Sequence, residues 1–256
     1  MNRVIVPMNA FHHQDLSRKG QEAFLSIIAD ADAYGVELRR ELWMNFREEL
    51  KTLKPKLKKL NLFVVYSAPV ELWEKDGALN PQLETVFREA EELGAQRLKL
   101  SLGHFDADHS DLAQLKDWLD KQASEVNVLI ENDQTLYGGN IENLNRFFTA
   151  AQKIGLPVGM TFDTGNWSFT GEVMEQALAK LSDYVDYVHF KEVKERQGEL
   201  VTLPLSEEPA SSWRKPAQVF PESMHKALEF PLKDTNEIRK YISLVSEAGA
   251  ESEENV

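Results

Sequence analysis

Short apolar runs alternate with longer amphipathic stretches from one end of the chain to the other, and few folds accommodate that pattern. In the longer stretches apolar residues recur at spacings of three and four, as in Leu83-Val86-Phe87-Ala90-Leu93, which is typical of helices that bury one face. The short runs are the expected strands and cover residues 3–8, 35–38, 62–66, 97–100, 126–130, 158–162, 184–190 and 226–230. Strands that alternate with helices predict βα units and a parallel sheet. The chain is therefore expected to be an α/β protein with eight such units.

The junctions between expected helices and strands repeat one construction. Gly35, Gly94 and Gly155 each stand where a helix should end and a strand should begin, and the left-handed conformation that glycine tolerates is common there. Asn80 followed by Pro81 looks like an N-cap and a first helical residue. A repeated junction favours one closed barrel, and a length of 256 residues is close to the ~250 typical of (β/α)8 barrels.

An open, doubly wound sheet is the alternative architecture. Such a sheet normally carries a glycine-rich first turn that binds a nucleotide, and Pro7-Met8-Asn9-Ala10 is not such a turn. We therefore predict a single-domain (β/α)8 TIM barrel over residues 1–249 and a flexible acidic tail over residues 250–256.

Charge and composition exclude several classes of function. The chain has 42 acidic and 29 basic residues, and its formal net charge of -13 repels a phosphate backbone, so nucleic acid is not an expected partner. The absence of cysteine leaves oxygen and imidazole as the strong metal ligands. No apolar run approaches the ~18 residues that a spanning helix needs, and the run after Arg3 is too short for a signal peptide. We expect a cytoplasmic protein with no membrane partner.

Potential metal ligands follow the last four expected strands. In a (β/α)8 barrel the working residues stand at the C-terminal ends of the strands, which meet at one rim. Glu131, Asp163, His189 and Glu229 stand at those ends. Each residue alone is as well explained as a helix N-cap, an ion-pair partner or a hydrogen-bonded structural histidine. Four in consecutive units favour a shared site.

Three carboxylates gathered at one rim repel one another unless a cation neutralises them. A divalent metal ion removes that conflict. Ligation by oxygen atoms and one imidazole suits Mn2+, Mg2+ or Co2+, and Zn2+ stays open. The expected cofactor is therefore one divalent metal ion, whose identity the ligand types leave undetermined.

The segments that carry these residues resemble a known family. Residues 129–132 (Leu-Ile-Glu-Asn), 162–166 (Phe-Asp-Thr-Gly-Asn), 188–192 (Val-His-Phe-Lys-Glu) and 228–231 (Leu-Glu-Phe-Pro), together with 35–39, are similar to segments of the xylose isomerase-like TIM barrel superfamily. That superfamily includes ketose 3-epimerases, hydroxypyruvate isomerase, inosose dehydratase and, more distantly, endonuclease IV. The resemblance covers nearly the whole chain in order. It implies one divalent metal held by Glu131, Asp163, His189 and Glu229, with Glu131 and Glu229 also able to exchange protons with a substrate.

The chain departs from the family pattern at two positions. Asn166 stands where many members have histidine after Asp-x-Gly, and Asp133 stands where many have histidine after Glu-Asn. Two substrate-contacting imidazoles of the family are therefore missing. Asn166 still offers hydrogen bonds to a sugar hydroxyl, but it does not take up a proton near neutral pH as histidine does. The identity of the substrate is left open by these changes.

Further residues after the strands are candidates for a substrate pocket, and each has a plainer interpretation. Lys191 either steadies a substrate hydroxyl or forms an ion pair with Glu192, and the ion pair is the commoner outcome. Glu37 either points into the site or pairs with Arg39 or Arg40. His104 and Trp167 complete the set of pocket candidates, with an ordinary loop histidine and core packing as their alternatives.

The resemblance implies a metal-dependent sugar isomerase or epimerase, and a metal ion held by these ligands would stabilise the enediolate through which such an enzyme acts. Glu131 and Glu229 come from the fifth and eighth expected strands, hence from opposite sides of a shared ion, and are the expected catalytic acid and base. A dehydratase acting on a keto-polyol at the same site and a non-catalytic sugar-binding barrel are the alternatives. Residues 202–209 lack the glycine cradle that binds phosphate, which favours an unphosphorylated sugar or polyol ketone. The expected partner is this small molecule, and a homo-oligomer is left open.

Overall fold

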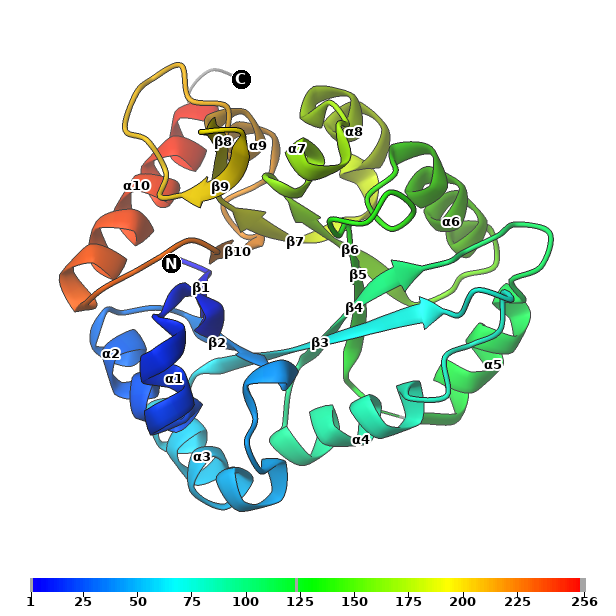
Figure 1. The fold of residues 1–256 in the computed structure, drawn as a ribbon, viewed down its shortest axis with the longest axis horizontal. Helices are drawn as coiled ribbons and strands as arrows, with labels where there is room; N and C mark the ends of the chain where they lie inside the picture. Colours follow the sequence, from blue (N-terminus) through cyan, green and yellow to red (C-terminus); the bar gives the residue numbers. More distant parts are fainter. Residues whose placement is uncertain (1, 123, 254–256) are drawn as a thin grey trace. The chain divides into compact units, whose positions relative to one another are not determined.

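The computed structural model describes residues 2–122 and 124–253 and contains a closed barrel of parallel strands (Figure 1). The strands follow chain order around the barrel, and the last pairs with the first. They are β1 (Val4–Pro7), β2 (Gly35–Arg39), β3 (Phe63–Trp73), β4 (Arg97–Gly103), β5 (Asn127–Glu131), β6 (Val158–Asp163), β7 (Val185–Phe190) and β10 (His225–Leu228). All eight predicted strands are present, with helices between them. The predicted (β/α)8 TIM barrel is therefore confirmed.

Strand β3 is longer than the predicted run 62–66. It extends to Trp73, although Pro69 interrupts the apolar pattern. Proline lacks an N–H group, so it is tolerated in a strand only at a position that donates no hydrogen bond to a neighbouring strand. Pro69 is exposed while Ala68 and Val70 on either side are buried, which is how the strand accommodates it.

A hairpin after β7 was not predicted. Its strands, β8 (Glu192–Arg196) and β9 (Glu199–Leu203), pair antiparallel as a separate two-stranded sheet. Gln197 and Gly198 form the turn with φ angles of 55° and 84°, the left-handed values that a tight hairpin turn requires. The strands are largely polar and exposed, so they lack the apolar alternation by which a strand is recognised.

The chain divides into two compact units. Unit 1 comprises the described residues up to Val65 and from Val188 onward. It contains β1, β2 and β10, and its core includes the edge-to-face pair of Phe230 and Tyr241, with ring centroids 4.7 Å apart. Its helices are α1 (His13–Lys19), α2 (Leu25–Asp30), α3 (Phe46–Leu60), α9 (Arg214–Val219) and α10 (Thr235–Glu253), with the short 3-10 turns η1 (Met8–Ala10), η2 (Gln21–Phe24) and η3 (Arg40–Leu42).

Unit 2 comprises Tyr66–Tyr187 and contains β4, β5 and β6. Its core includes Phe105, Phe147 and Phe148, whose rings pack edge to face in sequence at centroid distances of 5.2 and 5.1 Å. Its helices are α4 (Leu83–Leu93), α5 (Leu112–Gln122), α6 (Ile141–Lys153), α7 (Asn166–Thr170) and α8 (Met174–Leu181), with the 3-10 turn η4 (Ser182–Tyr184). The amphipathic pattern of the sequence explains α4 and α6, which bury the predicted apolar positions.

Two of the helix-end predictions concern unit 2 and have different outcomes. Gly94 ends α4 in the left-handed conformation, with φ 73°, as predicted. Asn80, however, does not cap α4, because the helix begins at Leu83. The Asn80 side chain instead accepts a hydrogen bond of 2.9 Å from the N–H of Gln82, which forms a turn before the helix.

The C-terminal segment was predicted to be a tail from residue 250. Helix α10 extends to Glu253, and residues 254–256 lie outside the described residues. Within the described part of the chain, no helix is long and apolar enough to cross a membrane.

Candidate functional site

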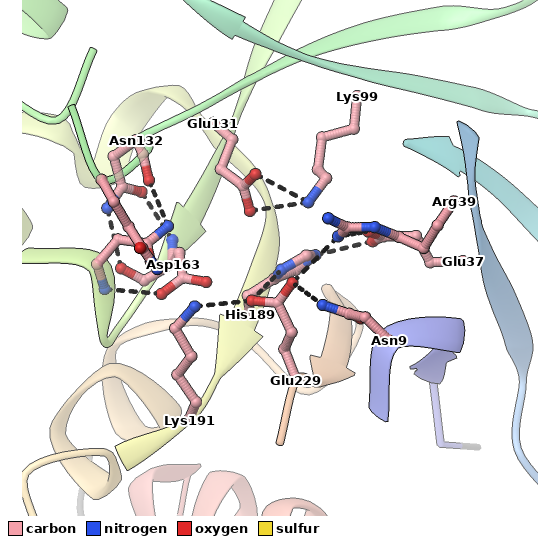
Figure 2. A network of polar contacts seen from close by, with 12 residues as sticks. Asn9, Glu37, Arg39, Lys99, Glu131, Asn132, Asp163, His189, Lys191 and Glu229 are labelled. Carbon is pink, nitrogen blue, oxygen red and sulfur yellow. Dashed lines mark hydrogen bonds and ion pairs between the residues drawn. The ribbon is translucent and has the colours of Figure 1, made fainter. Parts of the chain in front are cut away.

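Unit 2 supplies two carboxylates at the ends of neighbouring parallel strands. Glu131 is the last residue of β5, and Asp163 is the last residue of β6. The register pairs Glu131 with Thr161, so both carboxylates stand at the C-terminal end of the pair. The Glu131 carboxylate accepts two hydrogen bonds from the ammonium group of Lys99, at 2.8 and 2.9 Å (Figure 2).

Asp163 is fully buried and held by backbone groups. Its Oδ1 atom accepts hydrogen bonds of 2.9 Å from the N–H groups of Gly165 and Asn166. Its own backbone forms a reciprocal pair with the Asn132 side chain, which donates to the Asp163 carbonyl at 3.0 Å and accepts from its N–H at 2.8 Å. Backbone donors favour the ionised carboxylate and fix its direction. The end of β6 is thereby locked to the residue that follows β5.

Asn166, a pocket candidate, lies in the same network. Its Nδ2 atom donates to the carbonyl of Asn132 at 2.8 Å, and its Oδ1 atom accepts from Gln134 at 3.1 Å. The side chain is 5% exposed. Asn166 therefore connects the segments after β5 and β6, and contact with a substrate stays a prediction.

Unit 1 supplies the imidazole and the third carboxylate. His189 lies near the end of β7, and Glu229 follows β10 directly. The Nε2 atom of His189 lies 2.9 Å from Oε2 of Glu37, and its Nδ1 atom lies 3.4 Å from Oε2 of Glu229. His189 and Glu37 are both fully buried.

The contact with Glu37 decides which nitrogen of His189 is available as a ligand. A carboxylate accepts a hydrogen bond, so Nε2 carries the proton in the neutral imidazole and Nδ1 carries the lone pair. Histidines that bind metals commonly donate their other N–H to a carboxylate in this way. Glu37 therefore orients His189 and is not a free carboxylate aimed at a substrate.

Glu229 is surrounded by hydrogen-bond donors. Its Oε1 atom accepts from Asn9 at 3.1 Å and from Arg39 at 3.2 Å, and its Oε2 atom accepts from Lys191 at 2.8 Å (Figure 2). Arg39 also contacts Oε1 of Glu37 at 3.2 Å, which is the pairing proposed from the sequence as the alternative for Glu37. The guanidinium group thus joins the two carboxylates of unit 1.

The predicted ion pair between Lys191 and Glu192 is wrong. Consecutive residues of an extended segment point to opposite sides, so the two side chains diverge. Lys191 turns to Glu229, whereas Glu192 accepts a hydrogen bond from the N–H of Ser206 and lies 3.4 Å from Lys194.

The clustered carboxylates were predicted to need a metal ion to neutralise them, but the chain supplies cations of its own. Lys99 pairs with Glu131, Lys191 pairs with Glu229, and Arg39 contacts both Glu37 and Glu229. These three cations offset part of the negative charge of Glu37, Glu131 and Glu229, so the case for a metal ion depends also on the donor types and their orientation.

Lys99 and Asn9 are the residues of this network that were not predicted from the sequence. Lys99 stands in the run Arg97-Leu98-Lys99-Leu100, whose alternation places it on the same side of β4 as Ser101, so a charged residue facing inward could have been noticed. Asn9 follows β1 in the same way that the four predicted ligands follow their strands. Their partners, in contrast, are far away in the sequence.

The remaining pocket candidates lie in unit 2. Trp167 is 1% exposed and packs against Phe162 with ring centroids 5.4 Å apart, so it is a core residue with little surface to offer a ligand. The His104 ring stacks on Tyr137 at a centroid distance of 3.8 Å, and its buried Nε2 atom has no hydrogen-bond partner among the described residues.

Asp133, which replaces a family histidine, shapes the loop after β5. Its Oδ1 atom accepts hydrogen bonds from the N–H of Thr135 at 2.8 Å and from its hydroxyl at 2.5 Å. Burial raises the pKa of Asp133, and hydrogen bonds from Thr135 and Ser101 oppose that rise. A Cβ at Gly138 would lie 2.5 Å from the Asp133 carboxylate, so a larger residue there would require the carboxylate to shift. Asp133 is thus a loop-stabilising residue.

Tyr137 gives a titration that can be measured. Its hydroxyl donates to Glu71 at 2.6 Å, and this hydrogen bond, with burial as the second cause, raises the pKa of Tyr137 to about 12. Because the folded pKa is above the ordinary value of 10.0, the contribution to stability is complete below that pH and is lost as the pH rises through about 12. Glu71→Gln is expected to bring the pKa back toward the ordinary value, as measured by ultraviolet absorption of the phenolate.

Tyr137→Phe identifies which step of the absorption titration belongs to Tyr137. It removes that phenol and leaves an aromatic ring stacked on His104. A high-pH step that persists unchanged in Glu71→Gln would show that Glu71 is not the cause of the shift.

No protein-family model matches the chain, and a comparison with curated proteins also finds no match. Solved structures do match in fold. The IOLI protein with a binding zinc atom superposes with a TM-score of 0.67 at 11% identity, covering 98% of each chain. An L-ribulose 3-epimerase gives 0.65 at 12% identity, covering 99% of this chain and 97% of that one.

A probable 3-DHS dehydratase, AsbF of Bacillus anthracis, gives a TM-score of 0.62 at 11% identity, covering 95% of this chain and 98% of that one. At these identities the similarity establishes the fold. The resemblance to the xylose isomerase-like TIM barrel superfamily, inferred from the sequence, is consistent with these structures.

Proposed function

We propose that the protein is a metal-dependent sugar isomerase or epimerase acting on a small, unphosphorylated sugar or polyol ketone. One observation carries the proposal. Four consecutive strands of the barrel order, β5, β6, β7 and β10, each carry a potential metal ligand at or next to their C-terminal end. These residues form a group that could hold one ion: Glu131, Asp163, His189 and Glu229.

The donor set fits a divalent metal ion. Three carboxylates and one imidazole suit Mn2+, Mg2+, Co2+ or Zn2+. Glu37 holds Nε2 of His189 and thereby fixes the lone pair on Nδ1, which lies on the side of Glu229. The similar fold that was solved with zinc supports a metal at such a site, without deciding which metal this chain takes. Bound there, the ion would supply Lewis-acid stabilisation of negative charge on substrate oxygens.

The two glutamates are the proposed proton carriers. Glu131 and Glu229 come from strands on either side of β6 and β7 in the barrel order. One carboxylate would remove the proton next to the carbonyl group, and the other would return a proton to the opposite face, which inverts that carbon. Return of the proton to the neighbouring carbon would instead exchange an aldose and a ketose. Both reactions belong to the proposed class.

A dehydratase acting on a keto-polyol is the second candidate. It begins with the same proton removal and differs in the departure of a hydroxyl group. Its support is the similar fold of a probable 3-DHS dehydratase, which matches about as well as the epimerase does. The side chains near the glutamates do not separate the two, since Lys191 can donate a hydrogen bond either to a retained hydroxyl or to a leaving one.

Solvent-deuterium incorporation tests the proposed function. The purified protein is incubated in D2O with a panel of ketoses and inososes and with each candidate metal in turn. An isomerase or epimerase is expected to introduce deuterium at a carbon atom of the substrate and of a product that has the same molecular formula. A product that has lost water would instead establish the dehydratase, and the absence of exchange across the panel with every metal would contradict both.

A further inference from the structure

Lys99 is a charged residue in a place where barrels usually carry apolar side chains. The interior of a (β/α)8 barrel is filled by layers of side chains from the strands, most of them bulky and branched. Lys99 lies in the middle of β4, and its side chain is 2% exposed. The register pairs Lys99 with Leu129 and Ser101 with Glu131 on the adjacent strand β5. Lys99 therefore lies one layer below Glu131 on the same side of the sheet.

The ammonium group of Lys99 spans that layer. Two residues of a parallel strand rise by roughly 6.6 Å, which is within the reach of an extended lysine side chain. The Nζ atom lies 2.8 Å from Oε1 and 2.9 Å from Oε2 of Glu131. Because the two distances are nearly equal, the ammonium group is centred on the carboxylate and fixes its rotation. The Glu131 side chain is 15% exposed and that of Lys99 is 2% exposed, so the carboxylate is the more accessible partner of the pair.

A buried ammonium group carries a large desolvation cost unless a counter-charge is close. A branched apolar residue would fill the same layer without that cost. The charge of Lys99 therefore needs a reason beyond packing, and its position against both oxygens of a proposed metal ligand and proton carrier suggests one.

We propose that Lys99 is a positioning residue that orients the Glu131 carboxylate and lowers the affinity of the site for its metal ion. This inference rests on the proposed function. The positive charge of Lys99 lies within a few ångströms of the carboxylate that would bind the ion, so it repels a divalent cation there. The same ion pair holds the carboxylate in one direction, which a proton carrier needs. Lys99 thus weakens metal binding and at the same time holds the Glu131 carboxylate in the direction that proton transfer requires.

The test is the dissociation constant for Mn2+, measured by competition with a chromogenic chelator. Two variants remove the charge. Lys99→Met keeps most of the volume, and Lys99→Gln keeps a hydrogen-bond donor toward Glu131. Both are expected to bind Mn2+ about tenfold more tightly than the wild type, in line with the loss of a nearby like charge. The stoichiometry should not change. Lys99→Arg keeps the charge and is expected to stay close to the wild type.

Lys226→Met is the matched control. Lys226 is also 2% exposed, but it is not one of the potential metal ligands, and its ammonium group lies beside Gly249 of α10. This variant shows whether the loss of any buried lysine changes metal binding, and its dissociation constant is expected to equal that of the wild type. Turnover of an identified substrate by Lys99→Met is expected to fall while its metal affinity rises. A purely structural role for Lys99 would lower both together.

The outcomes distinguish failure of the proposed function from failure of the proposed role of Lys99. A wild type that binds no divalent metal would overturn the proposed function itself. A wild type that binds Mn2+, with unchanged or weaker binding in both Lys99→Met and Lys99→Gln, would overturn the role of Lys99 alone. Failure of both variants to fold would assign Lys99 a folding role and would also overturn it.

Discussion

Replacement of His189 and Asp163 by alanine is expected to abolish binding of a divalent metal ion. The double variant removes the imidazole and the most deeply buried of the three carboxylates. Glu131 and Glu229 would remain, but each is engaged by a lysine of the chain. Two such carboxylates are a poor site for an ion that needs four or more ligands. Elemental analysis after dialysis against the metal, together with titration calorimetry, measures the change from about one ion per chain to none.

The variant must be shown to fold, because His189 and Glu37 are buried against each other. Circular dichroism and thermal unfolding provide that check, and His13→Ala, which removes an exposed histidine of α1, is the control for the loss of any imidazole. Unchanged metal content in a folded double variant would place the site elsewhere. In the wild type, affinity is expected to fall as the pH is lowered, since protons compete for the same carboxylates and imidazole.

The fold was predictable because the sequence pattern that indicates it, a strand followed by a helix, is repeated along the chain. Each strand is a short apolar run between amphipathic helices, and one misread unit, such as β3 with its exposed Pro69, does not change the count. The hairpin of β8 and β9 was not predictable in the same way. It buries little apolar surface, so nothing in its sequence distinguishes its strands from a polar loop.

The positions of the four predicted ligands were also readable, because strand ends in a barrel share one rim. The partners of those ligands were not. Glu37 lies 152 residues from His189, and Arg39 lies 190 residues from Glu229. Such pairs depend on the register between strands and on side-chain reach, which a single sequence does not encode in any local pattern. For the same reason the sequence favoured Glu192, the adjacent residue, as the partner of Lys191.

The largest effect on turnover is expected from Glu229→Gln and Glu131→Gln. Glutamine keeps an oxygen ligand for a metal ion but has no proton affinity near neutral pH. Metal should therefore remain bound while turnover falls by roughly 10²-fold or more, the usual scale of general acid and base catalysis. Glu22→Gln, at an ion pair with Lys56, is the control for loss of a carboxylate outside the site.

The two variants are not expected to be equivalent, because their surroundings differ. Glu229 accepts hydrogen bonds from Asn9, Arg39 and Lys191, whereas Glu131 accepts hydrogen bonds from Lys99. In an epimerase each carboxylate serves one face of the substrate, so a variant that lacks one can still exchange substrate hydrogen with solvent deuterium through the other while forming little product. Mass spectrometry of substrate and product in D2O measures that asymmetry. If both variants turn over a known substrate at nearly the wild-type rate, the glutamates are metal ligands without a role in proton transfer, and the search for the base moves to Lys191 and His104.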